Sequence, residues 1–196
     1  MHRSRIAAIA ALGCSLALLT PTLASAHTGS GGSGDRESGQ ARLSWAMSRG
    51  PLTDLIPTEA GPFDHARATA MMVGFRSSTF VLHVSGIGLN AAGESVVGED
   101  FGAHLHIGPC VPGNGDAALG HYNIDVIHGV LSPVISDKTE VWLDFVVNGD
   151  GRGQATARVP WVPAPGKHAI VIHQEPTDGA SGKAGARQAC LPLEIQ

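Results

Sequence analysis

The feature that most constrains the fold of this chain is a series of short runs of β-forming residues, separated by glycine- and proline-rich turns. The clearest runs are residues 80–84, 141–147, 154–159 and 169–173. Turn sequences stand beside them, notably Asn-Gly-Asp-Gly at 148–151 and Pro-Ala-Pro-Gly-Lys at 163–167. Segments with helical periodicity are nearly absent. We therefore expect an all-β antiparallel domain, built as a sandwich or a Greek-key barrel.

The first 40 residues differ in composition and predict export. A basic start is followed by an apolar segment at 6–19 and by Ala-Ser-Ala at 24–26, the pattern of a signal peptide over residues 1–26. The apolar segment is too short for a membrane span. Lipid attachment at Cys14 is an alternative, although Cys14 lies inside the apolar segment rather than at its end.

Residues 27–40 are rich in glycine and serine, and we expect them to form a flexible leader. Residues 41–196 are then one domain, exported to the extracellular space or to the cell envelope or periplasm. The net charge is −4, and the 13 lysines and arginines are scattered along the chain. Neither a nucleic acid nor an anionic membrane is therefore expected as a partner. Trp45, Trp142 and Trp161 are expected in the core or at an interface.

The cysteines predict a disulfide. Removal of residues 1–26 would take away Cys14 and leave Cys110 and Cys190. An even pair of cysteines in an exported protein favours a disulfide between them. Two free, buried thiols are the alternative.

A metal site is indicated by His104 and His106. If this segment is a strand, both side chains project from one face, with imidazoles roughly 6–7 Å apart, and such a pair can share one metal ion. A histidine pair without any ligand role is the alternative. Two further histidines are candidates: His121 in Gly-His-Tyr-Asn and His173 at the end of the run 169–173. Arg187 lies three residues before Cys190.

Taken in order, these motifs resemble the copper/zinc superoxide dismutase family. The chain has His-x-His, a following Cys, Gly-His-Tyr-Asn, Val-Ile-His and Gly-x-Ala-Gly-x-Arg-x-Ala-Cys in the order of the family, between Ala103 and Cys190. The N-terminal half matches only as generic β. The resemblance implies an eight-stranded antiparallel Greek-key barrel or sandwich with long loops. It also implies that Cys110 pairs with Cys190.

The resemblance implies copper ligands and a function. His104, His106, His121 and His173 would bind copper, with His121 at the position that bridges to zinc and Arg187 guiding the anion. The expected protein is an exported superoxide dismutase that converts superoxide to dioxygen and hydrogen peroxide by Cu(II)/Cu(I) cycling, with His121 relaying a proton. A non-enzymatic copper-binding or copper-delivery protein on the same fold is the alternative, and it would not need Arg187. The sequence also allows a homodimer. It does not identify the partner that loads copper.

The zinc half of the site departs from the family. The family has two more histidines and an aspartate after the bridging histidine, whereas residues 122–148 contain one histidine, His128, and Val141 aligns with the zinc aspartate. The loop 174–182 is also short and rich in glycine, and the chain therefore resembles copper-only members. Without zinc, a carboxylate is expected to hold His121. The candidates are Asp125, Glu140 and Asp178, which together with His128 could instead form an improvised zinc site.

Overall fold

The structure, a computed structural model, describes residues 43–196. The expected signal peptide, the glycine-rich leader and Cys14 lie outside the described residues. Ten strands, one four-residue α-helix and one 3-10 helix make up the domain: β1 (Ser44–Pro51), β2 (Thr53–Asp54), β3 (Arg67–Gly74), β4 (Ser78–Ser85), β5 (Asp100–Phe101), β6 (Ala103–His106), η1 (Gly115–Ala118), α1 (Ile124–Ile127), β7 (Phe145–Val146), β8 (Arg152–Val159), β9 (Gly166–His173) and β10 (Arg187–Ile195). None of the helices in this part of the chain is long and apolar enough to cross a membrane.

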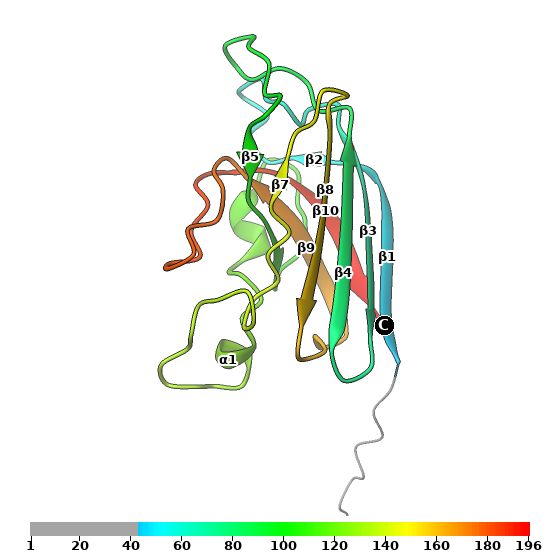
Figure 1. Ribbon diagram of the computed structural model, residues 1–196, viewed down its shortest axis with the longest axis vertical. Coiled ribbons are helices and arrows are strands. Elements are labelled where there is room, and N and C mark those ends of the chain that lie inside the picture. The colour runs from blue at the N-terminus through cyan, green and yellow to red at the C-terminus, as the bar shows by residue number, and fades with distance from the viewer. Residues whose placement is uncertain (1–42) are drawn as a thin grey trace, which may run out of the picture. The chain divides into compact units, whose positions relative to one another are not determined.

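The strands form two four-stranded antiparallel sheets and a short two-stranded ladder. The first sheet has the order β1-β3-β4-β8, the second has the order β2-β10-β9-β6, and β5 pairs with β7. In Figure 1 the first sheet stands on the right, and the long loops with α1 stand on the left. The prediction of an all-β antiparallel sandwich is confirmed. Ten strands replace the expected eight, and three of them, β2, β5 and β7, are only two residues long.

One predicted strand is wrong in its length. Residues 141–147 were expected to form a continuous strand, but only Phe145–Val146 does so. The alternation in the sequence is still meaningful, because Val141, Leu143, Phe145 and Val147 are each at most 2% exposed. The segment runs extended beside β6 but makes only scattered backbone bonds, such as Leu143 N to Ala103 O at 2.6 Å. The periodicity of the sequence therefore predicted correctly which side chains are buried. Whether the segment forms a strand depends on backbone hydrogen bonds to a neighbouring strand, and the sequence does not specify that neighbour.

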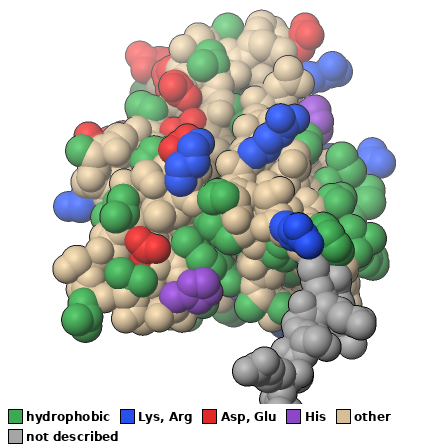
Figure 2. All heavy atoms as spheres, turned by 60° about the horizontal axis from the view of Figure 1, so that its bottom comes forward, with side chains coloured by type: hydrophobic (Ala, Val, Ile, Leu, Met, Phe, Trp, Pro, Cys, Tyr) green, Lys and Arg blue, Asp and Glu red, His purple; other side chains and the backbone are tan. Residues whose placement is uncertain are grey.

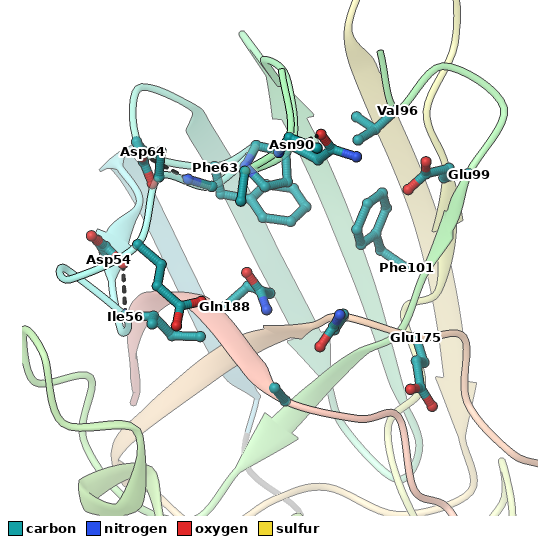
Figure 3. A pocket seen from close by; sticks show the side chains of 18 residues that line it. Asp54, Ile56, Phe63, Asp64, Asn90, Val96, Glu99, Phe101, Glu175 and Gln188 are labelled. Atoms are coloured by element: carbon teal, nitrogen blue, oxygen red, sulfur yellow. Dashed lines mark hydrogen bonds between the residues drawn. The ribbon is translucent and has the colours of Figure 1, made fainter. Parts of the chain in front are cut away.

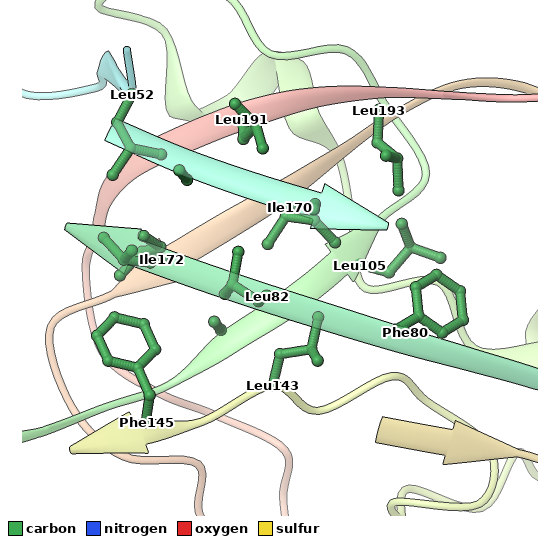
Figure 4. Packing of buried hydrophobic residues seen from close by; sticks show 14 of the residues in the cluster. Leu52, Phe80, Leu82, Leu105, Leu143, Phe145, Ile170, Ile172, Leu191 and Leu193 are labelled. Carbon is green, nitrogen blue, oxygen red and sulfur yellow. The ribbon is translucent and has the colours of Figure 1, made fainter. Parts of the chain in front are cut away.

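The core lies between the two four-stranded sheets (Figure 4). Leu82 and Phe80 of β4 face Leu105 of β6 and Ile170 and Ile172 of β9, and each is at most 1% exposed. Burial of each such side chain contributes about 1.5–3 kcal/mol. Because side chains alternate along a strand, the neighbours of these residues must point outward from the sandwich. The outer face of the second sheet therefore receives His104 and His106.

Candidate metal centre

Three of the four histidines are positioned by regular strands. His104 and His106 of β6 are in register with Val171 and Ala169 of β9, and His173 ends β9. These side chains lie on the face of the second sheet that points away from the core. A loop carrying η1 covers this face, where Leu55 and Ala118 pack against Val171 and Cys190. His104 and His106 are consequently 0% exposed, which is unusual for histidine and requires that their polar atoms be satisfied.

The fourth histidine comes from the loop that follows η1. His121 forms an isolated β-bridge with His106, and the next residue, Tyr122, donates its amide to Leu105 O at 2.7 Å. The side chain of His121 is 20% exposed. One nitrogen from each of the four histidines can be chosen so that all four lie within 4.8 Å of one another. The four residues predicted from sequence are therefore brought together, and they could hold a metal ion.

Each imidazole is held by a hydrogen bond at one nitrogen. His106 Nδ1 donates to Leu119 O at 3.1 Å, and His173 Nδ1 donates to Gly185 O at 3.3 Å. A carbonyl can only accept, so the proton of each neutral ring is on Nδ1 and the lone pair is on Nε2. The two Nε2 atoms face each other at 3.2 Å. Two lone pairs at this distance repel each other unless a cation or a proton lies between them.

In each of the remaining two histidines, one ring nitrogen is likewise held by a neighbour and the other is free. His104 Nε2 lies 2.6 Å from Thr177 Oγ1, while His104 Nδ1 is buried and has no hydrogen-bond partner. His121 Nδ1 lies 2.9 Å from Glu140 Oε2, which leaves its Nε2 as the free nitrogen. An unpaired buried nitrogen is costly unless it has a ligand. The donor set therefore fits a metal ion that prefers imidazole nitrogen, a group that includes copper and zinc.

The electrostatics keep these rings in the neutral form that binds metals. Burial lowers the pKa of His104 and His106 well below the ordinary value, and the neighbouring imidazoles lower it further. Burial also lowers the pKa of His173, to about 4. At neutral pH these three rings are uncharged.

Glu140 is the carboxylate that holds His121. It is 5% exposed, and besides His121 it accepts hydrogen bonds from Trp142 Nε1 at 3.0 Å and Asn123 Nδ2 at 3.1 Å. Burial alone would raise the pKa of Glu140, but the hydrogen bonds from His121, Trp142 and Asn123 outweigh burial and lower it. Gly182 lies over this pair at φ 69°, where an added Cβ would come within 3.3 Å of Glu140 Oε2.

The other predicted supporting residues lie in local structures of their own. Asp125 Oδ2 accepts from Val134 N, and Asp178 Oδ1 accepts from the amides of Ala180 and Ser181. His128 is the exposed C-cap of α1. Within residues 43–196, the four histidines are the only group of three or more His, Cys, Asp or Glu side chains placed to share a metal.

A second set of hydrogen bonds supports the cluster at His104, and it was not predicted from the sequence. Thr177 Oγ1, which contacts His104, donates to Asp144 Oδ1 at 2.7 Å, and Thr177 N donates to Asp144 Oδ2 at 2.8 Å. In the sequence, Asp144 is only one of several acids between residues 122 and 148. Thr177 lies in the loop after β9, and no local pattern marks it.

Arg187 begins β10 beside the cluster. Its Nη1 and Nη2 donate to Gly115 O and Leu119 O, so the guanidinium is fixed against the loop that carries η1. Leu119 O therefore accepts from both Arg187 and His106, and Leu119 has φ 60°, a left-handed conformation that is uncommon for leucine. The positive charge of Arg187 lies close enough to contribute to the low pKa of His106 and His173.

The predicted disulfide between Cys110 and Cys190 is confirmed, and the alternative of two free thiols is wrong. It joins the segment before η1 to β10, three residues after Arg187. The bond therefore ties the covering loop to the strand that carries Arg187, on the same face of the sheet as the histidines.

A separate cavity of about 670 Å³ contains none of the four histidines (Figure 3). Phe63 and Phe101 line it together with carboxylates that include Asp64, Glu99 and Glu175. Carboxylates without imidazole suit harder cations than copper.

Comparison with known proteins supports the fold alone. No protein-family model matches the chain, and no curated protein does. Among solved structures, the structure is similar to that described as "Crystal Structure Analysis of the clock protein EA4", with a TM-score of 0.54 and 14% sequence identity. The match covers 78% of this chain and 94% of that chain.

Proposed function

We propose that this protein is an exported, copper-dependent superoxide dismutase. The observation that carries the proposal is the convergence of four imidazoles, each held at one nitrogen and free at the other, beside the fixed guanidinium of Arg187. The ordered motifs that resemble the superoxide dismutase family support the same function. The overall reaction would convert two superoxide anions and two protons to dioxygen and hydrogen peroxide.

The four histidines would hold the copper ion through His104 Nδ1, His106 Nε2, His121 Nε2 and His173 Nε2. Bound copper would supply a one-electron Cu(II)/Cu(I) couple that takes an electron from one superoxide and gives it to another. Neutral imidazoles bind both oxidation states, and the absence of a thiolate from this set leaves room for a small anion.

Arg187 would attract and orient the superoxide anion. A guanidinium is always charged and has five N–H donors, of which the bonds to Gly115 O and Leu119 O use two. The remaining donors are available to an anion. Because the carbonyls fix its orientation, little conformational entropy is lost when the anion binds.

His121 would transfer protons at Nε2. It is the partly exposed member of the cluster, whereas His104 and His106 are fully buried. Glu140 accepts the proton of His121 Nδ1, so a proton gained from solvent would be carried on Nε2, on the side of the other histidines. We propose that Glu140 takes the orienting role that a second metal would otherwise have, and that zinc is not required.

The test is dismutation by the purified, copper-loaded protein, compared with Arg187→Ala and Arg187→Lys. The Ala variant should bind copper normally but turn over about tenfold more slowly at low ionic strength, with a smaller deficit at high salt. The Lys variant should be intermediate. Lys138→Gln, which removes a cation paired with Asp137, is the matched control and should be unchanged.

A copper-binding or copper-delivery function is the alternative, and one observation favours it. Both terminal nitrogens of Arg187 donate to backbone carbonyls, as they would if this residue only braced the loop. In that case the wild-type protein would bind copper without dismutation, and Arg187→Ala would destabilise the loop rather than slow turnover.

A further inference from the structure

The outer face of the first sheet is positively charged. Strands β1, β3, β4 and β8 contain four arginines and no aspartate or glutamate, although the chain as a whole has a net charge of −4. Arg49, Arg67, Arg152 and Arg158 are all exposed. Arginines that are far apart in sequence thus share one surface, because alternate residues of four paired strands point the same way.

The same face carries a cluster of exposed apolar side chains. Strand register pairs Trp45 with Val73 and Met47 with Met71, and all four point away from the core. Leu43 before β1 and Phe75 after β3 extend the group, which we call the Trp45 cluster. Trp45 is 52% exposed and Met47 is 61% exposed. In Figure 2, hydrophobic side chains gather at the right with Lys and Arg side chains around them.

Two of these arginines and Arg76 lie around the margin of the Trp45 cluster, and Arg67 and Arg152 lie further along the same face. Arg158 ends the row that begins with Trp45 and Val73, and Arg49 follows Met47 on the outer side of β1. Beyond Val73, the Arg76 guanidinium lies 5.9 Å from the centre of the Phe75 ring. A large apolar patch with a polar rim is rare on a monomer unless it binds a protein or a membrane.

The area and the charge together indicate the partner. Six side chains that each expose roughly 100 Å² approach the ~800 Å² per partner of a stable protein interface. A second copy of the same face would, however, bring arginines against arginines with no carboxylate from these strands to pair them. An anionic surface complements them directly, and aromatic and aliphatic side chains can insert between its headgroups.

We propose that this face of the first sheet docks on an anionic phospholipid surface, with the Trp45 cluster inserted and the arginines on lipid phosphates. The histidine cluster lies on the outer face of the opposite sheet, away from this surface. This proposal replaces the expectation, drawn from scattered cations, that an anionic membrane is no partner.

The experiment is flotation with vesicles of phosphatidylcholine alone or mixed equally with phosphatidylglycerol, using the protein with the same N-terminal residues in every variant. Wild type should float with the anionic vesicles, and Arg49→Gln with Arg158→Gln should bind at least about tenfold more weakly. Trp45→Thr with Val73→Thr should weaken binding similarly. Lys138→Gln with Lys167→Gln and Leu131→Thr with Val146→Thr, which change other exposed sites, should bind as wild type does.

A second measurement separates this face from the N-terminal segment as the point of contact. Tryptophan fluorescence should be quenched by spin-labelled lipid in wild type, and Trp45→Thr should remove that quenching even if the variant still floats. Equal flotation of all variants with unchanged quenching would overturn the proposal. A dimer in sedimentation velocity that Trp45→Thr with Val73→Thr dissociates, without a preference for phosphatidylglycerol, would assign the face to a second copy instead.

Discussion

The two halves of the histidine cluster are built differently. His104, His106 and His173 come from paired strands, are almost fully buried, and are held by a threonine or by backbone carbonyls. His121 comes from a loop, is partly exposed, and depends on the carboxylate of Glu140. On the proposed function, the strands would provide three fixed ligands, and the loop would provide a fourth that solvent can reach. The sheet fixes the positions of three histidines, whereas the loop places the fourth where solvent can reach it.

The largest effect should come from releasing the covering loop from the sheet. Replacement of Cys110→Ser together with Cys190→Ser removes a disulfide that closes a loop of 80 residues. The free energy of unfolding should fall by roughly 4 kcal/mol, because the unfolded chain regains loop entropy. Denaturant unfolding of the metal-free protein measures this difference. An unchanged midpoint would show that packing around Ala118 holds the loop without the disulfide.

The second prediction compares one histidine from each half. His106→Ala should weaken copper binding by more than about a hundredfold, because it removes a buried ligand and leaves Leu119 O without that donor. His121→Ala should leave three buried ligands and cost less affinity, but dismutation should fall to background. Competition with a copper chelator measures affinity in both variants. Equal losses of affinity would mean that strands and loop contribute alike.

The third prediction concerns Glu140. Glu140→Ala should lower dismutation about tenfold to a hundredfold, since His121 loses its orientation and Trp142 and Asn123 lose an acceptor. Glu140→Gln keeps an acceptor and should fall less. Asp178→Asn is the control, because Asp178 bonds only within its own turn. A loss in Asp178→Asn as large as in Glu140→Ala would refute the assignment of the supporting carboxylate.

The smallest effect should come from the relay behind His104. Thr177→Val removes the hydroxyl that links His104 Nε2 to Asp144, and copper affinity should fall severalfold. Thr177→Ser should restore it. The backbone of β6 already positions His104. The loss of copper affinity in Thr177→Val should therefore be a smaller factor than the loss of dismutation in Glu140→Ala. A larger loss would show that the strands alone do not position this histidine.

The sequence predicted the four histidines that cluster, but it predicted poorly the residues that support them. Strand alternation placed His104 and His106 on one face and His173 at a strand end, and the ordered motifs that resemble the family grouped them with His121. Glu140 was one of three candidate acids, because the loop that brings it to His121 has no periodicity to read. Thr177 had no signal at all.

The same limit applies to surfaces. The arginines of the first sheet look scattered along the chain, and only the register of β1, β3, β4 and β8 brings them together. Residues 141–147 show the converse, since their alternation predicted burial correctly but predicted a full strand wrongly. Local patterns specify which side of the chain is buried, whereas contacts between distant segments specify what lies beside it.

The most direct test of the central claim is metal analysis of the purified protein together with its dismutation rate, with copper supplied and zinc removed by a chelator. The account predicts about one copper per chain and rapid dismutation that added zinc does not increase. Copper bound without turnover, or turnover that requires zinc, would contradict it.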